Sequence, residues 1–168
     1  MTTYFAQSYD LHANGFYFDD GDEFREKFDK ARNEFGDPVE EFEIQFIDGE
    51  SIDARLFDVL SVGQGSIAAF IDALEQWREE DKVKLICAIG ECGYDFEVGK
   101  DNLDRLDVDI YPNMNMCDLA EQFVDEGLFG EIPESIQCYL DFDAIARDLA
   151  MDYSEIEIGG ERYVYRCA

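Results

Sequence analysis

Apolar residues in the first 60 positions recur with two different periods. Apolar side chains at alternate positions predict strands over residues 3–8, 15–18 and 42–48. Between the second and third of these segments, phenylalanines at helical spacing predict one helix, capped by Asp22 and ended by Gly36. The pattern therefore indicates a small antiparallel sheet with one helix packed on it.

The middle of the chain is predicted to be mainly helical. Glycine and small polar residues at 61–65 interrupt both periods and mark the best internal boundary. An apolar stripe over residues 66–77 then predicts a helix, and we expect Trp77, at its end, to belong to the core. A short helix over 82–89 and a helical turn near 102–106 complete this part.

The last third carries the clearest local signals. An edge strand should end at Pro112, which cannot donate a ladder hydrogen bond. A helix should begin at Asn115, with Asp118 in the position of a capping box. The run over residues 154–166 is divided by Gly159-Gly160, a two-residue loop typical of a β-hairpin.

The segment over residues 130–153 has a helical pattern with an acidic outer face. Pro133 fits the first position of a helix, where its missing N–H is not needed. Asp141, Asp148 and Asp152 should then form one narrow stripe beside the apolar residues. An ordinary amphipathic helix with a solvated face is the alternative interpretation, and it requires no partner.

These elements predict an α+β fold of three small units. The expected units are a sheet with one helix in residues 1–60, a mainly helical part in residues 61–106, and helices with a C-terminal hairpin in residues 107–168.

The charge of the chain restricts its partners. The sequence has 41 acidic and 13 basic residues, a formal net charge of −28. The excess is spread over the whole chain: the net charge is −11 in residues 1–60, −7 in residues 61–110 and −10 in residues 111–168. Direct binding to nucleic acid and to an anionic membrane is disfavoured, because both need clustered Lys and Arg. A strongly basic partner protein is favoured instead.

We find no catalytic or metal-binding constellation in the sequence. His12 is the only histidine, no calcium-binding or phosphate-binding loop occurs, and no pair among so many carboxylates stands out as catalytic. We therefore expect no enzyme activity, cofactor or metal. Arg147 is expected to form an ion pair with Asp143 on one helix face. The five cysteines lack C-x-x-C spacing, and with no signal-peptide pattern at the start we expect a protein of the reducing cytoplasm.

One string of residues resembles a known family. Pro133-x-Ser135-x-x-x-Tyr139-x-Asp141-Phe142, followed by Ala146-Arg147-Asp148, is similar to the most recognisable segment of the ArdA antirestriction proteins. The resemblance is clearest over residues 118–149 and faint in the first hundred residues. It implies an elongated three-part monomer that forms a homodimer, is carried by a mobile genetic element and imitates double-stranded DNA. The implied partner is a type I restriction-modification enzyme, whose DNA-binding channel is blocked stoichiometrically and without any reaction.

The resemblance and the acidic helix faces together give the expected site residues. The carboxylates expected to face the partner are Asp118, Glu121, Asp125, Glu126, Glu131, Glu134, Asp141, Asp148 and Asp152, of which Asp141 and Asp148 match the family motif. The residues expected to support them are Pro133, Ser135, Tyr139, Phe142, Ala146 and Arg147. Among the supports, Tyr139 and Phe142 are expected to pack. Two alternatives remain open: an acidic structural or adaptor protein, halophile-type or with a basic partner, and a hydrolase that uses two carboxylates.

Overall fold

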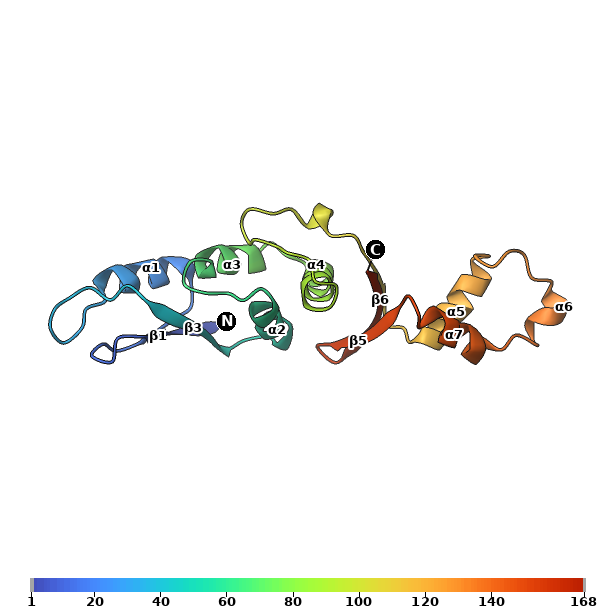
Figure 1. Cartoon of the computed structure of the whole chain (residues 1–168), viewed down its shortest axis with the longest axis horizontal. Helices are drawn as coiled ribbons and strands as arrows, with labels where there is room; N and C mark the ends of the chain where they lie inside the picture. Colours follow the sequence, from blue (N-terminus) through green and yellow to red (C-terminus); the bar gives the residue numbers. More distant parts are fainter. Residues whose placement is uncertain (1, 168) are drawn as a thin grey trace. The chain divides into compact units, whose positions relative to one another are not determined.

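The computed structural model describes residues 2–167, which form helices and two small antiparallel sheets (Figure 1). The prediction of an α+β fold is confirmed. The chain divides into two compact units, Met1–Arg105 and Leu106–Ala168, which are described separately. The expected further division near residue 60 remains a prediction.

The first unit is built on a three-stranded sheet of order β2-β1-β3. Its strands are β1 (Thr3–Ser8), β2 (Phe16–Phe18) and β3 (Phe42–Asp48). Alternate residues of β1 and β3 are buried, as the apolar period predicted. Aromatic rings dominate the core: Tyr4 stacks on Phe18 at 5.4 Å between ring centroids, and Phe18 contacts Phe24 at 4.9 Å.

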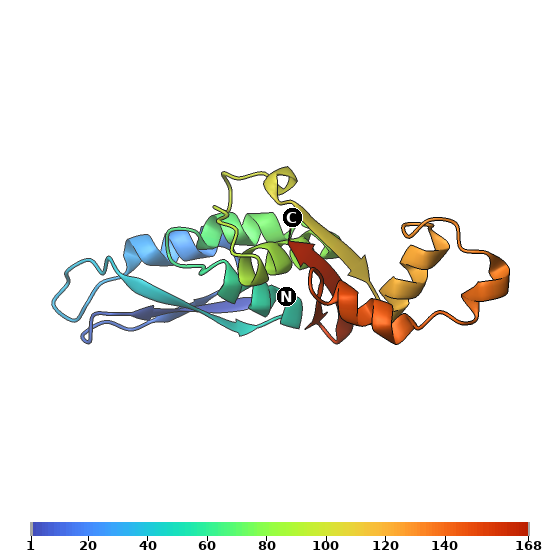
Figure 2. The same cartoon turned by 45° about the vertical axis from the view of Figure 1, so that its right-hand side comes forward.

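Helices cover this sheet and continue beyond it. They are α1 (Gly21–Lys30), α2 (Ser51–Val59), α3 (Ile67–Leu74), α4 (Glu79–Leu85), the π-helix η1 (Ile86–Glu91) and the 3-10 turn η2 (Leu103–Arg105). Figures 1 and 2 show α1 and α3 close together on the same side of the sheet. Gly21 allows this approach, since a Cβ there would lie 3.2 Å from the Cβ of Ala68.

The helices of residues 1–60 differ from those expected in their number and length. The helix predicted to reach Gly36 ends at Lys30, because the Asn33 side chain accepts the amide protons of Phe35 and Asp37 and turns the chain back. The unit also contains two helices here, since the sequence pattern missed α2. The buried side of α2 includes Asp53, so its stripe is interrupted by a charge.

The middle helices also differ from the expected ones. The helix predicted over residues 66–77 ends at Leu74, and Trp77 is only half-buried. The next helix starts three residues earlier than predicted, because the Asp81 carboxylate accepts the Arg78 amide proton at 2.9 Å and caps it. It then widens into η1, which the sequence pattern did not indicate.

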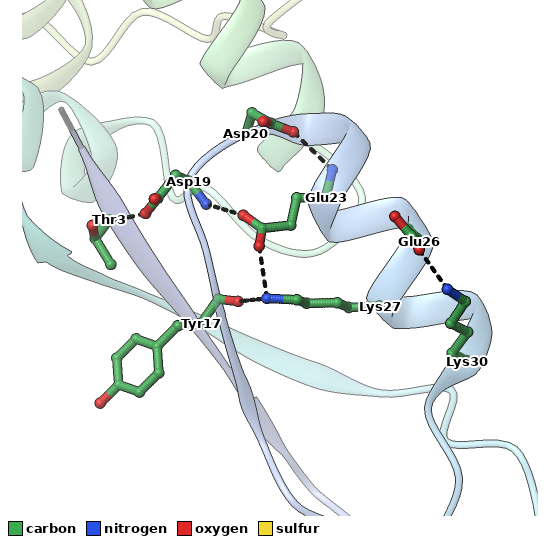
Figure 3. Close-up of polar contacts among 8 residues, drawn as sticks. All are labelled: Thr3, Tyr17, Asp19, Asp20, Glu23, Glu26, Lys27 and Lys30. Atoms are coloured by element: carbon green, nitrogen blue, oxygen red, sulfur yellow. Dashed lines mark hydrogen bonds and ion pairs between the residues drawn. The ribbon is translucent and has the colours of Figure 1, made fainter.

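The start of α1 is fixed by a chain of polar contacts (Figure 3). Asp20, and not Asp22, caps the helix by accepting the Glu23 amide proton at 2.7 Å. The Glu23 carboxylate accepts the Asp19 amide proton at 2.9 Å and binds the Lys27 ammonium at 2.7 Å. That ammonium also donates to the Tyr17 carbonyl oxygen at 2.7 Å, which connects α1 to β2. These hydrogen bonds lower the pKa of Glu23.

The second unit agrees more closely with the sequence pattern. Its sheet has the order β4-β6-β5, with strands β4 (Val108–Pro112), β5 (Ser154–Ile158) and β6 (Glu161–Cys167). The predicted edge strand and the hairpin at Gly159-Gly160 are confirmed. The helices are α5 (Met116–Asp125), α6 (Glu134–Gln137) and α7 (Phe142–Leu149). Leu119, Phe123, Tyr153 and Val164 form the core between α5, α7 and the sheet.

Candidate partner-binding surface

The single helix expected over residues 130–153 is wrong. The structure has the four-residue α6 and the separate α7, joined by turns in which the amides of Tyr139 and Leu140 bond three residues back. Figure 2 shows this connection as a loop that extends away from α5 and α7. Pro133 precedes α6 instead of occupying its first position. The chain leaves the helical path because the Asp141 side chain caps a new helix.

The expected stripe of three aspartates is consequently broken. Asp141 lies at the N-cap of α7, Asp148 lies within it and Asp152 lies beyond its end. All three are exposed to solvent. These exposed carboxylates are therefore distributed along α7 and just beyond its end, without following a single helical row.

The acidic side of α5 has the predicted form. Asp118, Glu121 and Asp125 are exposed, while Leu119 and Phe123 face the core. The expected capping box at its start is confirmed, with the Asn115 amide donating to Asp118 at 2.9 Å. This helix therefore presents carboxylates from a firmly packed support.

Three of the expected carboxylates surround one hollow. Asp125 is the last residue of α5, Glu131 lies in the loop that follows, and Glu134 is the first residue of α6. Together with residues of the turn between them, they line a hollow of about 530 Å³. Negative charge is therefore gathered at this loop as well as along α5.

The nine expected carboxylates fall into two groups. Asp118 and Asp141 cap helices, and Glu126 accepts a hydrogen bond from the Gln122 side chain at 2.7 Å. The other six carboxylates make no hydrogen bond or ion pair with the described residues. They are Glu121, Asp125, Glu131, Glu134, Asp148 and Asp152.

Basic residues compensate little of this charge. Residues 106–168 contain 15 acids and 3 bases. Of the bases, Arg166 pairs with Asp109 at 2.7 Å, whereas Arg147 and Arg162 make no ion pair within residues 2–167. The predicted ion pair between Arg147 and Asp143 is therefore wrong. Asp143 instead accepts the thiol proton of Cys117 at 3.4 Å, and this hydrogen bond raises the pKa of that thiol.

The residues expected to support the carboxylates have different environments. Ala146 is buried at 7% exposure and Phe142 is half-buried. Tyr139 is 82% exposed, so its expected packing role is wrong. The chain turns at this residue between α6 and α7 and leaves the ring without a neighbouring core. Pro133, Ser135 and Arg147 are exposed.

An exposed apolar group beside the carboxylates was missed by the sequence pattern. It consists of Leu128, Phe129, Ile136 and Tyr139, which are 49–82% exposed. A continuous helix over residues 130–153 would place Ile136 and Tyr139 on its apolar face. They are exposed because the helix is interrupted before α7. The sequence signal for this interruption is Asp141, a residue type that often caps a new helix.

The described residues contain no group of potential metal ligands. Within residues 2–167, no three His, Cys, Asp or Glu side chains are grouped as metal ligands would be. His12 pairs with Glu34 at 2.5 Å and packs its ring edge-on against Phe35. Every helix in this part of the chain is too short or too polar to cross a lipid bilayer.

These features define an acidic α+β protein whose candidate site is a surface of uncompensated carboxylates. The sequence model of the antirestriction protein ArdA matches residues 10–162. The chain therefore belongs to the ArdA family of antirestriction proteins. The match includes most of the first hundred residues, where the resemblance of individual motifs is faint. No curated protein matches the chain.

Proposed function

We propose that this protein inhibits type I restriction-modification enzymes by occupying their DNA-binding channel. In this proposal, carboxylates of the second unit take the places of DNA phosphates against Lys and Arg side chains of the enzyme. The protein acts in the cytoplasm, is encoded on a mobile genetic element, and makes or breaks no covalent bond.

One observation carries the proposal. Six of the nine expected carboxylates are exposed and lack any partner among the described residues. Only one of the three bases in the second unit forms an ion pair there. Such uncompensated charge opposes folding through self-repulsion, so it is of little use for stability and well suited to a basic partner.

The amount of charge is sufficient for a DNA-sized footprint. B-DNA carries one negative charge per about 1.7 Å of axis, so a net charge of −28 corresponds to roughly 48 Å of duplex. A homodimer would correspond to about twice this length. The electrostatic field would also accelerate association with a basic channel at low salt.

The exposed apolar group supports the homodimer that forms part of this proposal. Leu128, Phe129, Ile136 and Tyr139 are large side chains of the segment between α5 and α7, and water contact of apolar side chains is unfavourable. A second copy of the chain would cover them. Sedimentation of the wild type against a Phe129→Ser/Tyr139→Ser variant tests this, and a dimer that is unchanged in the variant would place the contact elsewhere.

Titration of the enzyme tests the mode of inhibition. Increasing amounts of the protein are added to a fixed amount of a type I restriction enzyme, and ATP-dependent DNA cleavage is measured. We expect activity to fall linearly to an end point at a fixed molar ratio, and longer preincubation to leave that ratio unchanged. Progressive loss of activity at a ratio far below one would indicate an enzyme and overturn the proposal.

A further inference from the structure

A second hollow lies in the first unit, between the end of α3 and the segment that follows η1. Its volume is about 700 Å³. Two half-buried aromatic rings line it, Trp77 and Phe96, with centroids 6.3 Å apart and planes inclined by 60°. Trp77 is the only tryptophan of the chain. The rings of Trp77 and Phe96 thus form an apolar wedge at an open hollow, and neither ring is fully buried in the core of the unit.

Hydrogen bonds fix the backbone beside both rings. The Trp77 amide donates to the Ala73 carbonyl oxygen at 2.9 Å, so the Trp77 backbone is tied to the last turn of α3. Phe96 precedes a tight turn in which the Glu97 amide donates to Asp101 at 2.8 Å. Gly99 in this turn has φ +81°, and a Cβ there would lie 3.2 Å from the Cβ of Ala69 on α3. The turn is therefore fixed against the helix that carries the other ring.

The charged side chains around the wedge are mainly acidic. Asp72, Asp81 and Asp101 line the hollow together with Lys100. The Lys100 ammonium is paired with Glu97 at 2.5 Å, the Asp101 carboxylate is paired with Arg105, and the Asp81 carboxylate accepts the Arg78 amide proton at 2.9 Å. The Asp72 carboxylate is exposed and makes no hydrogen bond or ion pair with the described residues. An anionic ligand is thus disfavoured and a cation favoured.

We infer that this hollow binds the guanidinium group of an arginine side chain from a partner protein. A planar cation can lie against the face of one of the two inclined rings while its N–H groups donate to a carboxylate that lines the hollow, above all the unpaired Asp72. A lysine ammonium lacks the flat face and gains less from the same surroundings. The inference rests on the proposed function for the identity of the partner, since an enzyme that binds DNA presents arginines toward phosphates.

The sole tryptophan allows a direct test. N-acetyl-arginine amide, which carries a single positive charge, is titrated into the whole protein while Trp77 fluorescence is recorded. We expect a saturable change with a dissociation constant in the millimolar range, and at least about fivefold weaker binding of N-acetyl-lysine amide. A response that NaCl reproduces at equal ionic strength, or equal binding of the two amides, would overturn the inference.

Substitutions separate the hollow from the general negative field. Asp72→Asn and Phe96→Leu should each weaken binding of the arginine amide, Phe96→Leu by about fivefold or more. Asp58→Asn removes the same charge from an exposed site on α2 outside the hollow and should leave binding unchanged. Equal loss in Asp72→Asn and Asp58→Asn would show that only net charge matters. Because Asp72 is exposed, its replacement should leave the core intact and the variant folded.

Failure of this inference can be distinguished from failure of the proposed function. If the protein inhibits the restriction enzyme stoichiometrically but Trp77 does not respond to the arginine amide, only the hollow is assigned wrongly. If Trp77 responds and the enzyme is not inhibited, the proposed function is wrong and the guanidinium site stands. Weaker inhibition by Phe96→Leu, with Asp58→Asn unaffected, is expected when both hold.

Discussion

The carboxylate of Asp141 accepts a hydrogen bond from the backbone amide of Ala144 at 3.0 Å. This bond makes Asp141 the N-cap of α7, at the same position where the family resemblance places a carboxylate directed at the partner. One side chain thus has a structural role and a proposed binding role. The two roles can be separated, because asparagine caps a helix about as well as aspartate but carries no charge.

Asp141→Asn should preserve stability and weaken inhibition of the restriction enzyme. Asp141→Ala should lose the cap as well, at a cost of about 1 kcal/mol in the free energy of unfolding. Urea unfolding and inhibition titrations of both variants measure the two effects. Equal inhibition by Asp141→Asn and the wild type would show that this carboxylate serves the helix alone.

The sequence pattern succeeded where elements are capped and bounded by local signals. The cap at Asn115, the hairpin at Gly159-Gly160 and the edge strand ending at Pro112 were all recognisable, because the hydrogen bonds or the proline that define them lie within a few residues. The acidic side of α5 followed from the same local reasoning.

The errors came from contacts that sequence spacing does not reveal. Asn33 turns the chain through its own side chain, and α2 was missed since Asp53 on its buried side is neutralised by Lys82 far along the chain. Over residues 130–153 the apolar residues recur at helical spacing throughout, so the pattern predicted one helix, although Asp141 starts a new one. The candidate carboxylates were placed on the surface correctly, but their arrangement and the exposure of Tyr139 depended on that break.

Lys82→Met should destabilise the first unit strongly. The Lys82 ammonium lies 2.5 Å from the Asp53 carboxylate, and the two side chains are 12% and 8% exposed. Removing the ammonium leaves the buried Asp53 carboxylate without its partner, and breaking such a pair costs about 3–5 kcal/mol. We expect this loss in chemical unfolding. The double variant Asp53→Leu/Lys82→Met should recover most of the stability, and a double variant as unstable as Lys82→Met would contradict the assigned role of the pair.

Glu23→Gln should lower the melting temperature near neutral pH and have little effect in acid. The pKa of Glu23 is lowered by its hydrogen bonds to Lys27 and to the Asp19 amide. A lowered pKa in the folded state stabilises the protein above the unfolded-state pKa, and this contribution is lost as pH falls through the folded-state pKa. Melting curves of the two proteins should therefore converge between about pH 6 and about pH 3.

Glu43→Gln provides the matched control for this experiment. Glu43 is exposed on β3 and makes no side-chain hydrogen bond or ion pair within the described residues. Its replacement should shift the melting temperature little at either pH. A difference between Glu23→Gln and the wild type that persists unchanged in acid would show that the contacts in Figure 3 do not stabilise the carboxylate form.

Binding to the enzyme should depend less steeply on salt than DNA binding does. Duplex DNA condenses counterions because its line charge is dense, and their release strengthens its binding to basic proteins at low salt. Carboxylates spread over a folded protein should condense fewer ions. The slopes of log K against log[salt] for the protein and for DNA on the same enzyme measure this. Equal slopes would contradict the expectation.

Competition between this protein and DNA tests the central claim most directly. A labelled duplex is bound to a type I enzyme without ATP, and its dissociation constant is measured at several concentrations of the protein. Two quadruple variants with equal net charge are compared with the wild type. One replaces exposed carboxylates of the second unit (Glu121→Gln, Asp125→Asn, Glu131→Gln, Glu134→Gln), and the control replaces exposed carboxylates of the first (Asp29→Asn, Glu43→Gln, Asp58→Asn, Asp95→Asn).

We predict that the apparent dissociation constant of DNA rises in proportion to the wild-type concentration, as for two ligands of one site. At about 0.5 kcal/mol for each exposed contact, the first quadruple variant should compete about 30-fold more weakly, and the control should compete like the wild type. DNA binding that is unaffected by the wild-type protein, or equal losses in the two variants, would contradict the claim that these carboxylates take the place of DNA.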